Sequence, residues 1–430
     1  MSKLTVAVSA PIDTYSGYGA RSRDLVKALL KSDKYNVSLL SQRWGNTRFG
    51  YLEDHNEDEL SSLIIPGLTS QPDVWIQITV PNEFQKVGKY NIGVTAGMET
   101  TLMHQSWVEG CNRMDLILTS SEHSKKVIEG SNYDIKDKNT GQLVKKLSLE
   151  KPIDVLFEGV DIPKYTSDNK TKSNLSKELD SINESFCYLL VGHWMQGEFG
   201  HDRKNVGYTV KSFLESFKNK QKPPALILKT NTATTSIMDR ERILEKIDAI
   251  RKTVKGGRMP NVYLIHGEIS DDQINELYNH PKIKVMVSHT KGEGFGRPLL
   301  EFSTTGKPII ASGWSGQVDF LHREMSLLIG GSLTNVHPSA VVKDMILPEA
   351  QWFTPSDTDV SRAYKKSYKQ YKEVTKAAKK QRRFTLDNFT FDDMVKKLHS
   401  ILDSNIPEMP KQIELTLPKL ELPKLEQIDG

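Results

Sequence analysis

HTKGEGFGRPLLEFSTTGKP, residues 289–308, has the strongest structural signal in the chain. The apolar run KVMVSH at residues 284–289 leads into it and predicts a buried strand, while PLLEFSTTG at residues 298–306 predicts a helix that opens on proline and ends on glycine. Between them, Gly294 and Gly296 lack a side chain, so the backbone can approach a ligand closely. Backbone amides at the start of a helix are unpaired and attract phosphate.

Two carboxylates flank this turn, because Glu293 and Glu301 are separated by seven residues. Glu293 is expected on the loop and Glu301 one turn into the helix. Carboxylates accept hydrogen bonds from paired hydroxyl groups such as those of a ribose or a hexose. A phosphate-binding turn between two hydroxyl-binding acids predicts a diphosphate between two sugars, which is a nucleotide-sugar.

The composition is that of a globular protein with more than one domain. The chain has 430 residues, of which 37% are hydrophobic and 26% are charged. No apolar run is long enough to cross a membrane, and MSKLTVAVSAPIDTY at residues 1–15 predicts a first strand rather than a signal peptide. Two cysteines, Cys111 and Cys187, are too few for a disulfide framework or a thiolate zinc site. We therefore expect a cytoplasmic, metal-free protein.

Short apolar runs alternate with amphipathic stretches along the first part of the chain. This order of strands and helices is typical of a parallel, doubly wound sheet. The expected strands are residues 5–9, 37–40, 74–78, 92–95, 116–119 and 153–157. We assign residues 1–166 to a first Rossmann-like domain, and the polar residues 167–185 to a linker.

The alternation restarts and defines a second Rossmann-like domain at residues 186–388. Its expected strands are residues 186–192, 225–230, 261–267, 284–289 and 308–312, and its expected helices include residues 206–217, 239–252, 271–278 and 298–305. The predicted fold class is therefore α/β, with two doubly wound parallel-sheet domains that face a central cleft. Ligands of open α/β sheets bind at such a place.

Two segments fall outside this alternation. Residues 134–147 predict a hairpin that turns at Asn139, Thr140 and Gly141. The tail at residues 405–430 contains LPKLE twice, at 417–421 and 422–426, and a proline every five residues there forbids a regular helix. We expect an extended tail there.

The ordered set of motifs resembles retaining glycosyltransferase family 4, which has the GT-B fold. The E-x7-E pattern surrounds GFG, and GKPIIAS and the turn GWSG then precede Asp319. Further segments occur in the family order, namely GVTAGMETT (93–101), MDLILTSSEHSKKV (114–127), DVLFEGVD (154–161), RKN (203–205) and HGEISDDQINELY (266–278). The resemblance covers residues 1–404 and implies that a last helix at 389–404 crosses back onto the first domain.

The resemblance also implies roles for individual residues. Glu301 would hold the nucleotide ribose, Glu293 would contact the donor sugar, and Lys204 would bind the diphosphate. The usual place of a second, arginine cation is His193 here, so Arg203 is the expected substitute. The other implied donor-site groups are the amides of Gly294, Phe295 and Gly296, the glycine loop Gly17, Tyr18 and Gly19, and Ile269 beside the base. Glu99 matches an acid near the reacting sugar, so the expected catalytic residues are Glu293, Glu99 and Lys204.

These roles fit the chemistry of sugar transfer. Breaking a sugar–phosphate bond leaves negative charge on the diphosphate, which cationic side chains and helix amides stabilise. Hydrogen bonds from sugar hydroxyls to a carboxylate contribute about 1.5–3 kcal/mol each. The resemblance implies retention by front-face attack, in which the donor phosphate takes the acceptor proton. The expected partner is a nucleoside-diphosphate sugar, preferably a UDP-sugar, and no cofactor or metal is expected.

A strongly basic segment lies at residues 362–383, with ten Lys or Arg and one Glu. Its net charge is 10 − 1 = +9, against +4 for the whole chain, so the remainder is 4 − 9 = −5. We expect one helix there, in which Lys365, Lys366, Lys369 and Lys372 are candidate polyanion contacts and Tyr364, Tyr368 and Tyr371 are available to stack on bases. The alternative is a solvated face. A modified base of phage-type DNA is one acceptor that would need such contacts.

Three features of the sequence also fit other interpretations. A dinucleotide-binding loop at Gly17–Gly19 is rejected, because residues 11–16 separate the first strand from the first glycine and Ser22 replaces the third. The acids at residues 357–359 resemble a metal-binding DxD but fit a helix start after Pro355. A third alternative is a GT-B binding module without catalytic activity. Such a module would not need both glutamates and Lys204, which are all present in this chain. A glycan, lipid or small-molecule acceptor stays open, as does the oligomeric state.

Overall fold

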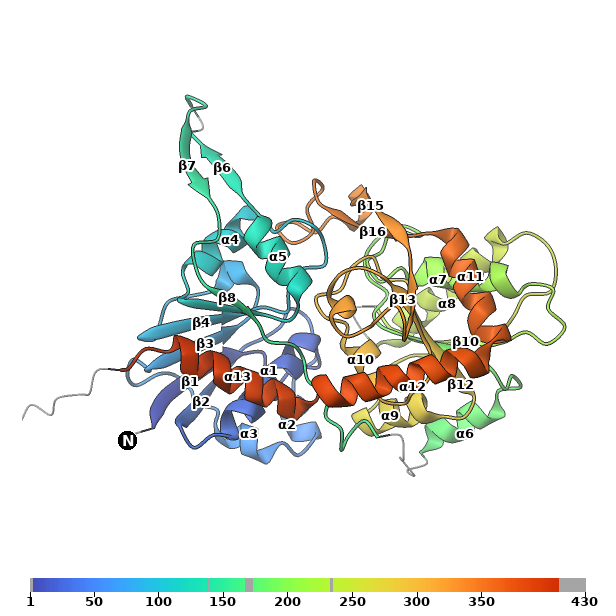
Figure 1. Cartoon of the computed structure of the whole chain (residues 1–430), viewed down its shortest axis with the longest axis horizontal. Helices are drawn as coiled ribbons and strands as arrows, with labels where there is room; N and C mark the ends of the chain where they lie inside the picture. The colour runs from blue at the N-terminus through green and yellow to red at the C-terminus, as the bar shows by residue number, and fades with distance from the viewer. Residues whose placement is uncertain (1–2, 138, 167–172, 233–234, 410–430) are drawn as a thin grey trace, which may run out of the picture.

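The computed structural model describes residues 3–137, 139–166, 173–232 and 235–409, and it contains two α/β domains built on the same plan (Figure 1). Each is centred on a six-stranded sheet in which every neighbouring pair of strands is parallel. Helices cover both faces of such a sheet, so its strands are largely apolar, and this is why the sequence revealed all of them except the short edge strand at residues 327–329. The predicted α/β class with two doubly wound parallel sheets is confirmed.

The first sheet has the order β2-β1-β3-β4-β5-β8. Its strands are β1 (Leu4–Ala10), β2 (Tyr35–Ser41), β3 (Val74–Ile78), β4 (Tyr90–Val94), β5 (Leu116–Thr119) and β8 (Ile153–Val155). The helices of this part of the chain are α1 (Gly17–Leu30), α2 (Tyr51–Asp54), α3 (Asp58–Ser62), α4 (Gln105–Asn112) and α5 (Glu122–Gly130), with a 3₁₀ turn η1 (Pro81–Glu83).

The second sheet has the order β11-β10-β9-β12-β13-β14. Its strands are β9 (Cys187–Val191), β10 (Ala225–Lys229), β11 (Val262–Ile265), β12 (Ile283–Ser288), β13 (Ile309–Ser312) and β14 (Leu327–Ile329). The helices are α6 (Asn174–Ser181), α7 (Val206–Phe217), α8 (Ile237–Thr253), α9 (Asp271–Asn279), α10 (Arg297–Ser303), α11 (Asp357–Lys369) and α12 (Tyr371–Asn388), with 3₁₀ turns η2 (Gly316–Asp319) and η3 (Pro338–Ala340).

The chain crosses between the two domains twice, and the two crossings lie side by side. The Val160 amide donates to the Phe389 carbonyl at 2.9 Å, and the Phe391 amide donates to the Val160 carbonyl at 2.9 Å. After the second crossing, α13 (Phe391–Asn405) packs against α1 and places Met394 and Leu398 in the core of the first domain (Figure 1). The last helix therefore belongs to the first domain, as the resemblance implied.

Two antiparallel pairs extend beyond the sheets. β6 (Tyr133–Lys136) and β7 (Leu143–Leu147) form the predicted hairpin, which projects from the first domain in Figure 1. β15 (Gly331–Asn335) and β16 (Gln351–Pro355) were not predicted, because β15 is largely exposed and lacks the apolar run of a buried strand. The β15–β16 pair contacts the first domain, since the Thr101 amide donates to the carbonyl of Gln351, the first residue of β16, at 2.9 Å.

The prediction of one basic helix over residues 362–383 is wrong. The segment is divided between α11 and α12 at Gln370, whose φ of −115° and ψ of 36° leave the helical range. The tyrosines are not available to stack on bases either. Tyr364 is fully buried, and the half-buried Tyr368 and Tyr371 pack against Phe186 beside the core of the second domain. The inner face of these helices needs apolar side chains, and the tyrosines supply them.

Other predictions fall partly outside what the structure describes. In the predicted linker, residues 173–181 form the N-cap and body of α6, which packs on α9, while residues 167–172 lie outside the described residues. The predicted tail lies outside them from residue 410 onward. No helix among the described residues combines the length and the apolar character that crossing a membrane requires.

Candidate functional site

The turn between β12 and α10 has the strand–turn–helix form that the sequence predicted. Gly296 is the N-cap of α10 and has φ of 102°, a left-handed conformation that favours glycine. Within the described residues, the amides of Gly294, Phe295 and Gly296 donate no hydrogen bond to another protein group. The Phe295 ring itself is buried against Phe320. Phe295 therefore offers its backbone, and not its side chain, to a ligand.

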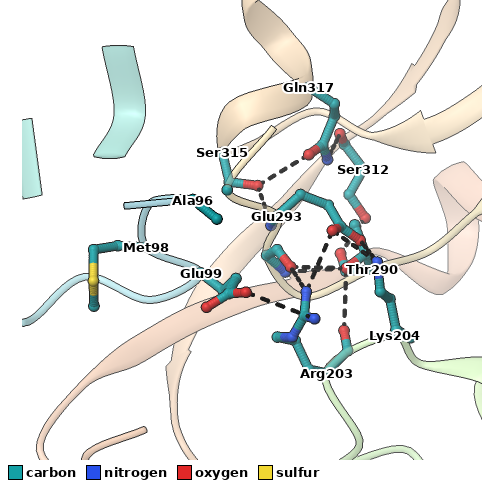
Figure 2. A network of polar contacts seen from close by, with 12 residues as sticks. Ala96, Met98, Glu99, Arg203, Lys204, Thr290, Glu293, Ser312, Ser315 and Gln317 are labelled. Carbon is teal, nitrogen blue, oxygen red and sulfur yellow. Dashed lines mark hydrogen bonds and ion pairs between the residues drawn. The ribbon is translucent and has the colours of Figure 1, made fainter. Parts of the chain in front are cut away.

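Glu293 lies at the centre of a buried charge cluster (Figure 2). Lys204 Nζ donates to its two carboxylate oxygens at 2.6 and 2.8 Å, and Arg203 Nη1 donates to Oε2 at 3.3 Å. Burial by itself raises the pKa of Glu293, but the two cations outweigh burial and hold that pKa below its usual range. The carboxylate is therefore ionised at neutral pH, and two cationic side chains are held beside it.

Arg203 also reaches the first domain. Its Nη2 lies 3.6 Å from Glu99 Oε1, and the two glutamates raise the pKa of the guanidinium against the opposing effect of burial. Arg203 thus lies within reach of both Glu99 and Glu293. Its role as the substitute for the family arginine at the His193 position stays a prediction. The structure brings Glu99, Arg203, Lys204 and Glu293 together from three separate segments of the chain (Figure 2).

A network of side chains that the sequence did not reveal supports the backbone of Glu293. Ser315 Oγ accepts from the Glu293 amide at 2.9 Å, and the same hydroxyl donates to Gln317 Oε1 at 3.1 Å. Gln317 Nε2 in turn donates to the Ser312 carbonyl at 3.0 Å. Ser315 holds φ at 69°, an uncommon value for a residue with a side chain. The small-residue turn after β13 therefore fixes the position of Glu293.

The glycine turn packs directly on a segment of the first domain. A Cβ atom built on Gly292 would lie 1.9 Å from the Glu99 carbonyl oxygen, and one on Gly294 would lie 2.2 Å from that of Ala96. Ser120 Oγ donates to the Ala96 carbonyl and lies 3.2 Å from that of Gly294, so it joins both sides. These glycines are required because two backbones approach each other here (Figure 2).

Glu301 lies in α10 and is held by different partners from Glu293. Arg297 Nε donates to Oε1 at 2.9 Å, and the Tyr278 hydroxyl donates to Oε2 at 3.3 Å. Burial raises the pKa of Glu301 to about 7, against the lowering effect of Arg297. The second glutamate of the pattern is therefore a buried carboxyl whose charge depends on its immediate partners.

The remaining predicted donor-site residues are the three at the start of α1 and Ile269 after β11. Gly17, Tyr18 and Gly19 were predicted in a loop, but they form the first turn of α1, because Ser16 Oγ caps the helix by accepting from the Gly19 amide. The Tyr18 hydroxyl lies 3.1 Å from Thr95 Oγ1 and accepts from the Ala96 amide at 3.2 Å. Ile269 follows β11 and packs, half-buried, against the second domain's core.

The predicted polyanion contacts are exposed. Lys365, Lys366 and Lys369 line a groove on the outside of α11, together with Arg362, Glu215 and Asp357. Lys372 is exposed on α12. Asp357 and Asp359 lie in the first turn of α11, which agrees with their assignment to a helix start. Among the described residues, no group of three or more His, Cys, Asp or Glu side chains could hold a metal ion.

Comparison with known proteins agrees with this arrangement. Residues 255–325, which contain Glu293, Glu301 and the glycine turn, match the family model described as "Glycosyl transferases group 1". No curated protein matches the chain by sequence.

Solved structures share the architecture at low sequence identity. The HepE protein of Anabaena, in a complex with UDP and glucose, has a TM-score of 0.59 and 13% identity, with 93% of this chain and 100% of that chain covered. A glycosyltransferase from Rickettsia africae has a TM-score of 0.60 and 14% identity, with coverages of 95% and 100%. Sucrose-phosphate synthase from Thermosynechococcus elongatus has a TM-score of 0.59 and 10% identity, with coverages of 94% and 99%.

These similarities show the GT-B fold, and the family match covers the part of the chain that carries both glutamates. The fold and the match together indicate that the chain is a glycosyltransferase.

Proposed function

We propose that the chain transfers a sugar from a nucleoside-diphosphate sugar to an acceptor hydroxyl with retention of configuration, as in glycosyltransferase family 4. The observation that carries the proposal is the cluster of Lys204, Arg203 and Glu293 beside the unpaired amides of the glycine turn. Uridine is the preferred base, which the UDP and UDP-glucose complexes of HepE support.

The proposed chemistry follows from the charges in the cluster. Lys204 and Arg203 stabilise the negative charge that develops on the diphosphate when the bond between the anomeric carbon and the phosphate oxygen breaks. Glu293 holds hydroxyls of the donor sugar, and its ion pairs keep it ionised for that task. Glu99 lies beside Arg203, where it can face the sugar ring from the first domain. The acceptor proton passes to an oxygen of the departing phosphate, so no side-chain base is needed.

The nucleoside end of the donor is assigned to Glu301 and Ile269. Glu301 accepts hydrogen bonds from the ribose hydroxyls, and Ile269 contacts the base at the end of β11. No cofactor or metal is invoked. We also propose a cytoplasmic location, which the two free and buried cysteines, Cys111 and Cys187, support.

Thermal unfolding with a panel of nucleotide-sugars tests the proposed donor class. A ligand that binds only the folded state stabilises it by about 2.7 kcal/mol at roughly a hundredfold excess over Kd. We expect one or more of UDP-glucose, UDP-N-acetylglucosamine, ADP-glucose and GDP-mannose to raise the Tm, with the largest increase for a UDP-sugar. The same ligand should leave the Tm of a Lys204→Ala variant nearly unchanged. If no nucleotide-sugar raises the Tm, the donor class is wrong.

We also propose that the acceptor is a nucleic acid. Its support is that the basic residues of α11 and α12 form an exposed face, including Lys365, Lys366 and Lys369. Phosphate contacts of this kind are independent of base sequence and depend steeply on salt. Tyr364 is buried, and Tyr368 and Tyr371 pack their rings on Phe186, so the proposal includes contact with the nucleic-acid backbone and no stacking on bases.

Neutralising two adjacent lysines tests the acceptor proposal. The Lys365→Gln/Lys366→Gln variant should bind duplex DNA more weakly, and the slope of log Kd against log salt should fall by about 2, because two phosphate contacts are lost. The Lys145→Gln/Lys146→Gln variant is the matched control, since this exposed pair lies on the β6–β7 hairpin. DNA binding that is absent, or equally weakened in both variants, would favour a glycan, lipid or small-molecule acceptor.

A further inference from the structure

Arg297 joins the two domains at the second glutamate of the pattern. It is the first residue of α10, in the second domain, and its Nε donates to Glu301 Oε1 at 2.9 Å. Its Nη1 donates to Asp24 Oδ2 in α1, which belongs to the first domain, and lies 3.8 Å from Glu158 Oε2. Asp24 and Arg297 are 273 positions apart in the chain. The Arg297 guanidinium therefore connects Glu301 both to α1 of the first domain and to Glu158, on the segment that crosses between the domains.

The contact is largely shielded from solvent. The side-chain exposures are 24% for Arg297, 17% for Asp24 and 8% for Glu301. Screening by water and salt is weak for charges in such positions, so this pair is stronger than an ordinary surface ion pair. Arg21, one turn before Asp24, is itself buried and donates to the carbonyls of Leu156 and Phe157. The α1 side of the contact is thus held rigidly against the crossing segment.

We propose that Asp24 and Arg297 are positioning residues that hold the Glu301 carboxylate for the ribose of the donor only when the two domains are in this arrangement. The inference rests on the proposed function, which assigns the ribose to Glu301. A guanidinium is planar and presents its donors in a fixed fork, so a bond to Asp24 on one side sets the direction of the bond to Glu301 on the other. Nucleotide affinity and domain closure are then linked.

The proposed linkage between nucleotide affinity and the arrangement of the two domains predicts an effect of each on the other. Loss of Asp24 frees Arg297 from the first domain, so Glu301 loses its fixed orientation and the ribose is bound less well. By reciprocity, a nucleotide that binds Glu301 favours the closed arrangement of the domains. Neither effect is expected of an ion pair that only stabilises the fold.

The test compares nucleotides with and without ribose hydroxyls. Calorimetry is performed with UDP, or with whichever of UDP, ADP and GDP binds the wild type most tightly, and with its 2′,3′-dideoxy analogue. We expect Asp24→Asn to weaken binding of the ribonucleotide about tenfold and to leave binding of the dideoxy analogue unchanged. Arg297→Lys keeps the charge but not the fork, and it should have the same effect. The double variant should be no weaker than either single variant.

Asp33→Asn is the matched control, because Asp33 follows α1 and, among the described residues, its one ion pair is with the exposed Lys3 at 3.7 Å. It should leave the affinity for both nucleotides unchanged. If Asp24→Asn folds poorly, as its thermal unfolding will show, Arg297→Lys provides the same comparison. Equal losses for the ribonucleotide and its dideoxy analogue, or no loss for either, would overturn the proposal.

The results that would overturn the proposed function differ from those that would overturn only the positioning role. If Glu301→Gln binds the ribonucleotide as tightly as the wild type does, the assignment of the ribose to Glu301 is wrong, and the positioning role of Asp24 and Arg297 falls with it. If the wild type binds no nucleoside diphosphate, the proposed donor class itself is wrong. In contrast, loss of affinity in Glu301→Gln without loss in Asp24→Asn overturns only the positioning role.

Discussion

Replacing Lys204 by alanine is expected to lower kcat/KM for sugar transfer by about two to three orders of magnitude. Loss of one preorganised group that stabilises the charge of a transition state has an effect of about this size in other enzymes. Lys204 Nζ makes the two shortest contacts to Glu293, at 2.6 and 2.8 Å, and it is the cation proposed to stabilise the departing diphosphate. Steady-state kinetics with the donor found by the thermal panel measures the effect. Lys218→Ala, an exposed lysine at the end of α7, is the control and should be active.

A double variant separates the catalytic role of Lys204 from its structural role. Removing Lys204 alone leaves the buried Glu293 carboxylate with one cation, Arg203, beside it, so the free energy of unfolding should also fall. Lys204→Ala/Glu293→Gln removes both charges and should recover most of the Tm without recovering transfer. If transfer recovers together with the Tm, the pair serves the fold and not the reaction.

Gly294→Ala is expected to abolish transfer for a purely geometric reason. The added Cβ would lie 2.2 Å from the Ala96 carbonyl oxygen of the first domain, far inside the contact distance. The position of the Cβ is set by the backbone and the oxygen is a backbone atom, so neither can rotate away. The two domains must then separate at the place where Arg203 lies between Glu99 and Glu293. Overpacking of this kind costs about 1–3 kcal/mol, so the Tm should fall as well.

Gly130→Ala provides the control for that experiment. Gly130 ends α5, has no heavy atom within 4 Å of a built Cβ, and is not among the glycines with positive φ. It should keep full activity and be as stable as the wild type, or slightly more so. Activity assays and thermal unfolding of both variants check the prediction. A Gly294→Ala protein that transfers sugar at the wild-type rate would show that the observed contact between the domains is not part of the active arrangement.

Much of the fold could be predicted because buried parallel strands carry a strong local signal. β3 (Val74–Ile78) and β5 (Leu116–Thr119) have the bounds that the apolar runs predicted. β15 was missed because its side chains are mostly exposed and its pairing partner, β16, lies beyond an intervening insert. The inward packing of the tyrosines did leave a signal in the sequence. Val360, Tyr364 and Tyr368 recur every four residues, which is the spacing of a buried helix face.

Patterns that act between neighbours along the chain predicted the strand–turn–helix around Glu293 and Glu301 and the alternation of strands and helices in both domains, because apolar periodicity and glycine placement are local signals. The order of the strands within each sheet is a tertiary feature. So are the position of Arg203 between Glu99 and Glu293, and the contact of Asp24 with Arg297, which also holds Glu301. These partners come from different domains, and spacing within one chain carries no information about charges that meet only after the domains pack together.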